Sequence, residues 1–288
     1  MELQIKDATF IYGEGTVFNK TALDKVNFTI NQDDFTAIIG HTGSGKSTLI
    51  QHLNGLLKPT MGEVLVDGEN IYKDKKMLVN LRQKVGLLFQ YPEYQLFETT
   101  VFKDVSFGPS NLKLSESEIE KRVRNALDAV GIAEDDFLKS PFELSGGQRR
   151  RVAMAGVLAL EPQILILDEP IAGLDPKGRE EFLQRILKMH EKLKIAIVLV
   201  SHNMDDVAKL AKKVVVISKG EIVLQGTVKE VFKEVDLLSS IGLMAPSTSY
   251  LMKALKEKGF DVPLDVYTVE EAIEVIKKIL RDRGKNGE

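Results

Sequence analysis

Apolar and polar residues follow two different rhythms along the chain, one typical of buried strands and the other of amphipathic helices. Short apolar runs predict strands at 35–39, 85–89, 164–167, 195–200 and 214–218. Between these runs, apolar residues spaced three and four apart predict helices at 47–57, 180–193 and 204–212. Strands that alternate with helices in this way indicate an α/β fold, with a mostly parallel sheet covered by helices on both faces.

The first third of the chain is typical of strands and tight turns, and the middle is typical of helices. Alternating or apolar segments predict further strands at 3–10, 26–30 and 63–66. From about Pro92 the pattern becomes helical. Ser115 and Glu118 form a capping box at the start of one helix, and Gly131 stands where that helix should end.

The pattern changes again near the C-terminus. A short helix is expected at 247–258, closed by Gly259, and a second helix should begin at Thr268, whose capping box Glu271 completes. We therefore expect a large domain over residues 1–235 and a small helical domain over residues 236–288.

Composition narrows the range of functions. The chain has 288 residues, enough for about two domains at roughly 150 residues each. Its 39 basic and 42 acidic residues nearly cancel, which argues against a general nucleic-acid binder. The absence of cysteine excludes disulfides and thiolate metal sites. With only 4 histidines, the composition argues against a zinc enzyme without excluding one.

The sequence also lacks a long apolar segment. Its longest apolar stretches, such as 152–160 and 195–200, fall short of the ~18–20 residues that a membrane span requires. The N-terminal residues Met1–Gln4 lack the basic and then apolar layout of a secretory signal. We expect a protein that stays inside the cell and that, if it works at a membrane, is held there by another subunit.

The strongest chemical signal lies between an expected strand and an expected helix, as a phosphate-binding P-loop requires. It consists of Gly40, His41, Thr42, Gly43, Ser44, Gly45, Lys46 and Ser47, and we count Thr48 in the same set. Glycines let successive N–H groups point at phosphate oxygens. Lys46 should contact the β- and γ-phosphates of a nucleotide, and the Ser47 hydroxyl should bind Mg²⁺. The alternative is a glycine-rich turn without a ligand.

A second signal is the apolar strand 164–167, which ends in Asp168 and Glu169. The carboxyl ends of parallel strands are where α/β proteins bind ligands. Asp168 is the candidate that holds Mg²⁺ through water, and Glu169 is the candidate base that orients or deprotonates the attacking water. The alternative is a pair of ordinary acids that cap a helix.

The third signal is the turn made of Leu144, Ser145, Gly146, Gly147 and Gln148. Alone it could be a linker or a helix cap. With the two other motifs at this spacing it resembles the signature sequence of ABC-type ATPases, a family with a RecA-like P-loop NTPase core, an antiparallel β subdomain and a helical signature subdomain at about 91–160. In that family the signature closes over the γ-phosphate of ATP held by a partner subunit.

The resemblance, which covers about residues 1–226, implies roles for single residues elsewhere. Gln90 matches the glutamine that reaches Mg²⁺ and the reactive water. Asp175 ends the segment 172–175, which matches the D-loop that lies across the dimer seam in that family. His202 matches the histidine that contacts the γ-phosphate, although alone it would read as a helix cap. Tyr12 matches the aromatic residue that stacks on adenine, with Phe18 as a competitor in the same loop.

One residue departs from the family pattern. Ile171 stands where many relatives carry a small hydroxyl residue. Because it lies beside the expected catalytic strand end, we expect a tuning effect and not a loss of activity.

The segment from Phe89 to Phe97, with Phe107-Gly108-Pro109 after it, resembles the ATP-binding subunits of energy-coupling factor (ECF) transporters, including the cobalt type. The resemblance is strongest to the second of two paralogous ATPase subunits. It implies a heterodimer with the paralogue, with a homodimer left open. A transmembrane T subunit would dock near Gln90–Pro109, and an S subunit would bind a vitamin or transition-metal ion.

This reading places the protein on the cytoplasmic face of the membrane, with the C-terminal helices as a dimerisation domain. Aromatic residues after Gln90 could instead fill the core of the helical subdomain, and the C-terminal helices could simply cap the ATPase core. A soluble ABC-type ATPase acting on nucleic acid or ribosomes is the alternative function. A small-molecule P-loop kinase fits less well, because the signature turn would have no role in it.

Overall fold

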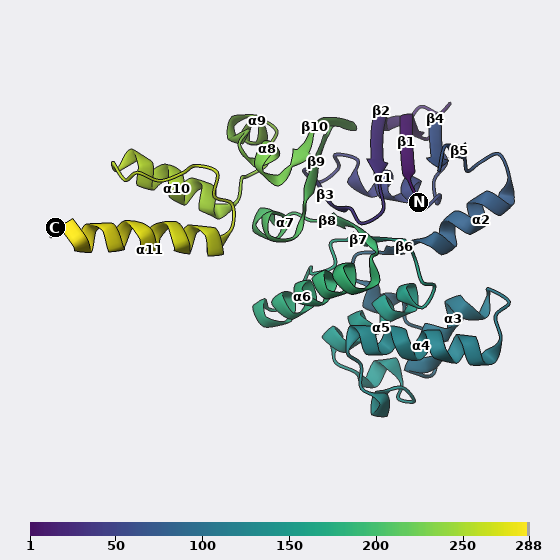
Figure 1. Cartoon of the computed structure of the whole chain (residues 1–288). Coiled ribbons are helices and arrows are strands. Elements are labelled where there is room, and N and C mark those ends of the chain that lie inside the picture. Colours follow the sequence, from purple (N-terminus) through teal and green to yellow (C-terminus); the bar gives the residue numbers. More distant parts are fainter. Residues whose placement is uncertain (287–288) are drawn as a thin grey trace.

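The computed structural model describes residues 1–286 and builds them around two sheets and a separate group of helices (Figure 1). The larger sheet has six strands in the order β10-β9-β3-β8-β7-β6. Their bounds are β3 Phe35–Ile39, β6 Val85–Leu88, β7 Ile164–Asp168, β8 Ala196–Val200, β9 Lys213–Ser218 and β10 Glu221–Thr227. All neighbours pair in parallel except β10, which is antiparallel to β9. The predicted mostly parallel sheet is therefore confirmed.

The centre of this sheet is buried on both faces. All five residues of β3 are buried between β8 and β9, and all five of β8 are buried as well. This burial explains why these strands read as continuous apolar runs and not as an alternation.

A second sheet of four antiparallel strands has the order β2-β1-β4-β5. The strands are β1 Leu3–Tyr12, β2 Lys20–Ile30, β4 Met61–Val66 and β5 Glu69–Asn70. Leu3, Ile5 and Phe28 from this sheet share one core with Ile38 of β3 and Leu49 of helix α1 (Lys46–Leu53). The P-loop is thus wedged between the two sheets.

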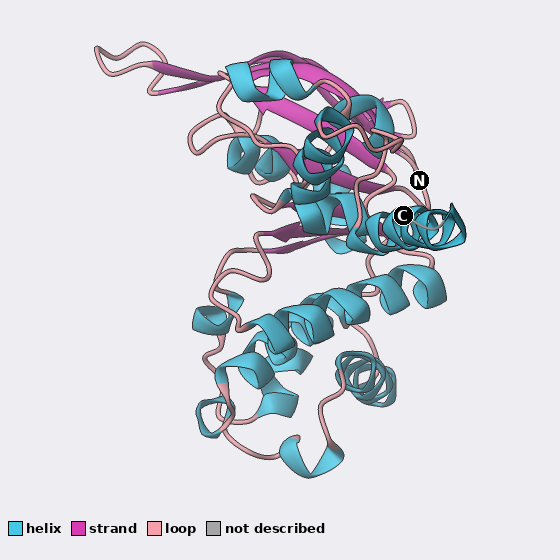
Figure 2. Cartoon of the chain, turned by 90° about the vertical axis from the view of Figure 1, so that its left-hand side faces the viewer, coloured by secondary structure: helices cyan, strands magenta, loops and turns pink. Residues whose placement is uncertain are grey.

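The helical part lies away from the antiparallel sheet, and both views show helices alone in this region (Figures 1 and 2). It contains α3 (Val101–Ser110), α4 (Glu116–Val130) and α5 (Gly146–Leu158). Helix α4 begins at Ser115, whose side chain accepts from the Glu118 N–H, and ends at Gly131 in the left-handed conformation. Its apolar stripe packs with α5 and with α6 (Pro176–Leu193) in one core.

The C-terminal segment packs partly on the main sheet and partly on itself. Beyond α7 (Met204–Leu210), it contains α8 (Val228–Phe232), α9 (Val235–Ser240), α10 (Ser247–Glu257) and α11 (Val269–Asn286). Leu238 and Leu243 join the core beside β3 and β9, whereas Met252 and Ala272 form a small core between α10 and α11. Leu238 and Leu243, which follow the expected division at residue 235, therefore pack on strands β3 and β9 of the larger sheet.

Some elements differ from the expectation. Helix α2 (Lys75–Lys84) was not anticipated, although Met77, Leu78 and Leu81 stand at helical spacing on its inner face. This apolar set is short, and only Leu81 among the residues of α2 is buried. Helix α1 ends at Leu53 and not at residue 57, since Gly55 turns the chain with φ +69°. Within residues 1–286, we find no helix with the length and apolar character of a membrane span.

Candidate functional site

The P-loop joins β3 to α1 and holds a buried lysine across its own backbone. Lys46 Nζ donates to the carbonyl oxygens of Gly40 at 2.7 Å and His41 at 3.0 Å. Gly40 is required by space, because a Cβ there would lie 2.3 Å from the Ile217 carbonyl oxygen. Gly45 is required by backbone conformation, with φ +113° at the N-cap of α1. The loop therefore presents backbone N–H groups at a helix N-terminus, a geometry that binds phosphate.

Two acids follow β7 beside this loop. Burial raises the pKa of Asp168 to about 6, the charge of Glu169 adds to this, and Lys46 and the Ser47 hydroxyl oppose it. Burial also lowers the pKa of Lys46, which the charges of Glu169 and Asp168 counteract. The cation, the hydroxyl and the carboxylates therefore form one electrostatic unit at the carboxyl end of the sheet.

This donor set fits Mg²⁺ bound together with a nucleotide. Ser47, Asp168 and Gln90 offer oxygen ligands, which a hard cation prefers. The residues that the structure describes contain no group of three or more His, Cys, Asp or Glu side chains able to hold a metal. Mg²⁺ commonly uses one or two protein ligands plus phosphate oxygens and water, so a site with the single half-buried carboxylate of Asp168 suits it.

Glu169 stands at the meeting point of three loops. Gln90 Nε2 donates to its Oε2 at 3.3 Å, and His202 Nε2 lies 2.5 Å from its Oε1. Its backbone has φ +47°, a conformation that is uncommon outside glycine and concentrated at functional sites. The structure thus brings together the three residues that the sequence nominated for catalysis.

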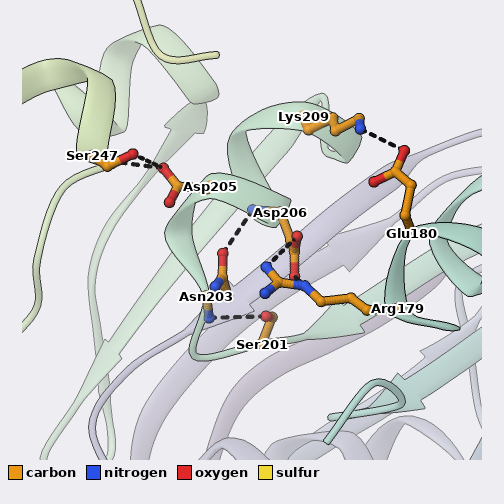
Figure 3. Close-up of polar contacts among 8 residues, drawn as sticks. All are labelled: Arg179, Glu180, Ser201, Asn203, Asp205, Asp206, Lys209 and Ser247. Atoms are coloured by element: carbon orange, nitrogen blue, oxygen red, sulfur yellow. Dashed lines mark hydrogen bonds and ion pairs between the residues drawn. The ribbon is translucent and has the colours of Figure 1, made fainter. Parts of the chain in front are cut away.

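The turn that carries His202 is fixed by its neighbours (Figure 3). The Ser201 hydroxyl accepts from the Asn203 N–H at 3.0 Å, and the Asn203 side chain caps α7 by accepting from the Asp206 N–H at 3.0 Å. The Asp206 carboxylate in turn receives two bonds from Arg179, of 3.1 and 2.6 Å. Arg179 lies one turn into α6, which Asp175 caps. The His202 turn and the Asp175 segment are therefore held to each other.

The signature turn lies elsewhere in the molecule. Ser145 and Gln148 form a complete capping box at the start of α5, and Leu144 before them is buried. A Cβ on Gly146 would meet nothing within 4 Å. Because α5 belongs to the helical part and α1 lies against the antiparallel sheet, this turn and the P-loop of the same chain are apart (Figure 1).

The two aromatic candidates for adenine differ in position. Tyr12 ends β1, packs edge-on against Phe10 with ring centroids 4.8 Å apart, and shares a 3.2 Å hydrogen bond between its hydroxyl and that of Thr48. Phe18 is 91% exposed in the loop between β1 and β2. Only Tyr12 is therefore fixed against the P-loop helix, which favours it over Phe18.

Sequence reasoning missed several polar residues that support the site. Arg179 and Asp206 join α6 to α7, and Arg150 pairs with Glu93 in the short 3₁₀ helix Pro92–Gln95. The signal available for Arg150 was weak, because it lies within the run Arg149–Arg151, which in a helix would commonly be solvated. Instead Arg150 is 3% exposed.

Comparisons with known proteins agree with this geometry. A family model described as "ABC transporter" matches residues 23–172. The chain is 53% identical over 287 residues to the "Energy-coupling factor transporter ATP-binding protein EcfA2" of Clostridium tetani, covering 99% of this chain and 100% of that protein. The protein of the same name from Caldanaerobacter subterraneus is 54% identical over 281 residues, covering 98% of each.

Solved structures show the same likeness. The structure of cbiO1 from Clostridium perfringens, described as part of the ABC transporter complex cbiONQ, has a TM-score of 0.74 and 43% identity, covering 87% of this chain and 98% of that one. The dimeric bacterial ABC transporter cassette MJ0796 has a TM-score of 0.69 and 32% identity, covering 78% and 98%.

These findings confirm the fold class and the resemblance inferred from the sequence, together with ATP as the nucleotide and ATP hydrolysis as the activity. The chain belongs to the ABC transporter family and, within it, to the ATP-binding proteins of energy-coupling factor transporters.

Proposed function

We propose that this protein hydrolyses Mg²⁺-bound ATP as one of two paired cassettes and that this cycle drives import of a vitamin or transition-metal ion by an ECF-type transporter. The observation that carries the proposal is the convergence of Gln90 and His202 on Glu169 at the strand end beside Lys46. Phosphoryl transfer to water needs this combination of a phosphate cradle, a cation and a group that orients the water.

The P-loop residues divide the work of holding ATP. Backbone N–H groups of residues 40–48 cradle the phosphates, and Lys46 turns from its carbonyl partners to the β- and γ-phosphate oxygens. Ser47, Gln90 and Asp168 would hold Mg²⁺, which when bound neutralises charge on those oxygens. Tyr12 would stack on the adenine from its position beside Thr48.

Glu169 acts on the attacking water. Its carboxylate accepts a hydrogen bond from Gln90 and lies against His202, so both side chains fix its orientation. In this role Glu169 accepts or orients the water proton, while His202 is placed to reach the γ-phosphate. The barrier falls mainly through positioning and charge neutralisation.

The signature turn serves a second molecule. Ser145 and Gly147 lie at the start of the 13-residue α5, apart from the P-loop of their own chain. A helix N-terminus with free N–H groups binds anions. We propose that this turn closes over the γ-phosphate held by a paralogous partner arranged head to tail, with Asp175 at the seam and a second copy of this chain as the other possible partner.

The segment after Gln90 provides the docking surface for the membrane T subunit. Tyr94, Phe97 and Phe107 are exposed, and the rings of Phe97 and Phe107 pack edge to face with centroids 5.1 Å apart. An exposed aromatic surface of this kind suits an amphipathic helix from a membrane partner. The substrate-binding S subunit would then be reached indirectly, and the protein would sit at the cytoplasmic membrane face without crossing it.

We further propose that residues 236–288 form a dimerisation domain and residues 1–235 the ATPase domain, with the helical subdomain at about 91–160. Val269, Ile273 and Leu280 are exposed on α11 and share one face at helical spacing. Exposed apolar side chains that gather on one face suit a protein contact.

The test uses the complete transporter complex. Glu169→Gln should bind ATP but lose ATP turnover at least a hundredfold, because the variant keeps the shape of the side chain but not its basicity. Lys46→Ala should weaken ATP binding in a titration with a fluorescent analogue. Glu181→Gln, an exposed glutamate of α6, is the matched control and should hydrolyse ATP normally. Near-normal steady-state hydrolysis by Glu169→Gln would remove Glu169 from the role of base.

A further inference from the structure

One buried arginine connects residues 91–97, here called the docking segment, to the loop that follows Glu169, the candidate base. Arg150 lies on α5 and is 3% exposed. Its Nε and Nη2 donate to the two carboxylate oxygens of Glu93 at 3.0 and 2.7 Å. Its Nη1 donates to the carbonyl oxygens of Pro170 at 3.1 Å and Ala172 at 2.8 Å. One guanidinium group therefore forms four hydrogen bonds to two segments that are far apart in sequence.

The two segments are those that the mechanism uses. Glu93 lies three residues after Gln90 and just before the exposed aromatic residues Tyr94 and Phe97. Pro170 and Ala172 are one and three residues after Glu169. The two segments are also joined directly, by the hydrogen bond from Gln90 to Glu169.

Both segments also contain a residue in an uncommon backbone conformation. Tyr91 has φ +53° and Glu169 has φ +47°, and neither is a glycine. Such conformations persist where the surroundings hold them. The bonds of Arg150 lie two residues beyond Tyr91, and one and three residues beyond Glu169, so they are placed to hold both turns.

The chemistry of the pair suits positioning more than stabilisation. A buried ion pair gives little net stability over apolar packing, because desolvation offsets the attraction. The planar guanidinium group of Arg150, however, fixes both the direction and the distance of its hydrogen bonds to Glu93 and to the loop after Glu169. Burial alone would raise the pKa of Glu93, but the hydrogen bonds and charge of Arg150 lower it below its usual value, so the carboxylate stays ionised.

We propose that Arg150 is a positioning residue that transmits movement of the docking segment to the loop that carries Glu169. A membrane subunit that shifts residues 91–97 pulls on Glu93, and Arg150 passes this displacement to the carbonyl groups of Pro170 and Ala172. Movement of the docking segment and movement of the Glu169 loop are then tied to each other, so that without this link ATP is hydrolysed without a matching movement of the docking segment. This inference rests on the proposed function, because it requires a partner at the aromatic surface.

The experiment compares two conservative variants in the full transporter complex. Arg150→Lys keeps the positive charge but loses the fork, and Glu93→Gln keeps the size of the side chain but loses its charge. ATP hydrolysis and substrate uptake are measured together in proteoliposomes, with KM for ATP and the thermal unfolding midpoint. Glu120→Gln is the matched control, because it alters an exposed glutamate that pairs with Arg124 in the same helical part.

We expect each variant to lower substrate uptake per ATP hydrolysed by about fivefold to tenfold, the size typical of mutations along a coupling network. KM for ATP should stay within about twofold, because the P-loop contacts are unchanged. The double variant should be no worse than the more affected single variant, since both changes break the same link. Glu120→Gln should behave like the unmodified protein.

Two results would overturn the inference. In one, both variants transport with the unmodified ratio of uptake to hydrolysis. In the other, uptake and hydrolysis fall in parallel with a lower unfolding midpoint, which indicates a structural role alone. Failure of the proposed function looks different, because the unmodified complex would then not couple hydrolysis to uptake, or Glu169→Gln would still turn over ATP.

Discussion

At the scale of single residues, the site is a set of charges that are costly to bury and useful when a ligand arrives. Asp168 is the clearest example, since burial raises its pKa to about 6 and Glu169 beside it adds to the shift. A carboxylate with a raised pKa destabilises the fold when it is ionised. A bound cation and nucleotide would offset this loss of folding free energy, because the cation pairs with the ionised carboxylate.

This cost predicts a pH dependence for the protein free of nucleotide and Mg²⁺. The folded pKa of Asp168 is above its unfolded value of 3.8, so the folded protein binds more protons between about pH 4 and 6 and loses stability as pH rises through that window. Asp168→Asn should therefore gain stability relative to the unmodified protein as pH rises, with a plateau above about pH 7. Thermal unfolding from pH 4.5 to 8 measures this, with the exposed Asp135→Asn as control. A difference that does not change with pH would contradict the prediction.

At the scale of elements, the loop that carries His202 is held by helices other than the P-loop helix α1. Helix α7, which follows His202, is tied to α6 by Arg179 and to the start of α10 by Asp205, which accepts from the Ser247 N–H and hydroxyl at 2.8 and 2.9 Å (Figure 3). The turn with His202 is therefore connected to both the seam of the proposed dimer and the C-terminal segment.

Two ion pairs between α6 and α7 allow a matched comparison. Asp206 is 5% exposed, so Arg179→Met should leave a buried carboxylate unpaired and lower the free energy of unfolding by about 2–3 kcal/mol. Lys209→Met removes the more exposed pair with Glu180 and should cost less than about 1 kcal/mol. Urea unfolding of both variants measures the difference. Equal losses would show that burial of Asp206 does not decide the cost.

At the scale of the whole molecule, the P-loop and the signature turn lie in different parts of the chain. The P-loop precedes α1, which packs between the two sheets, and the signature turn starts α5 in the separate helical part (Figure 1). This separation supports the proposed two-chain site, and we propose the exposed apolar face of α11 as a second contact for the same pair.

That face gives a prediction about assembly. Ile273→Glu and Leu280→Glu should weaken association with the partner cassette, because each places a charge in an apolar contact. Lys278→Glu lies on the opposite side of α11 and is the control. Sedimentation of the paired cassettes measures the dissociation, and circular dichroism checks that the helices remain. Unchanged association of both glutamate variants would exclude this face from the dimer.

The sequence by itself determined most strands and helices and the glycine turns, because hydrophobic spacing and caps act over a few residues. It predicted the bounds of β3 and the capping box of α11 correctly, and it missed β5, β10 and the short apolar face of α2. At α4 only half of the expected capping box forms, because Ser115 accepts from the Glu118 N–H while the Glu118 carboxylate accepts from Arg122. The family motifs then nominated Gln90, Glu169 and His202.

Only the tertiary structure decided which of these groups meet. The order of strands in the sheet places the ends of β6, β7 and β8 side by side, and this order brings Gln90 and His202 to Glu169. The same packing buries Arg150 against Glu93, which a run of three arginines does not reveal. Contacts between distant segments depend on how elements stack, and local spacing along a chain does not encode that stacking.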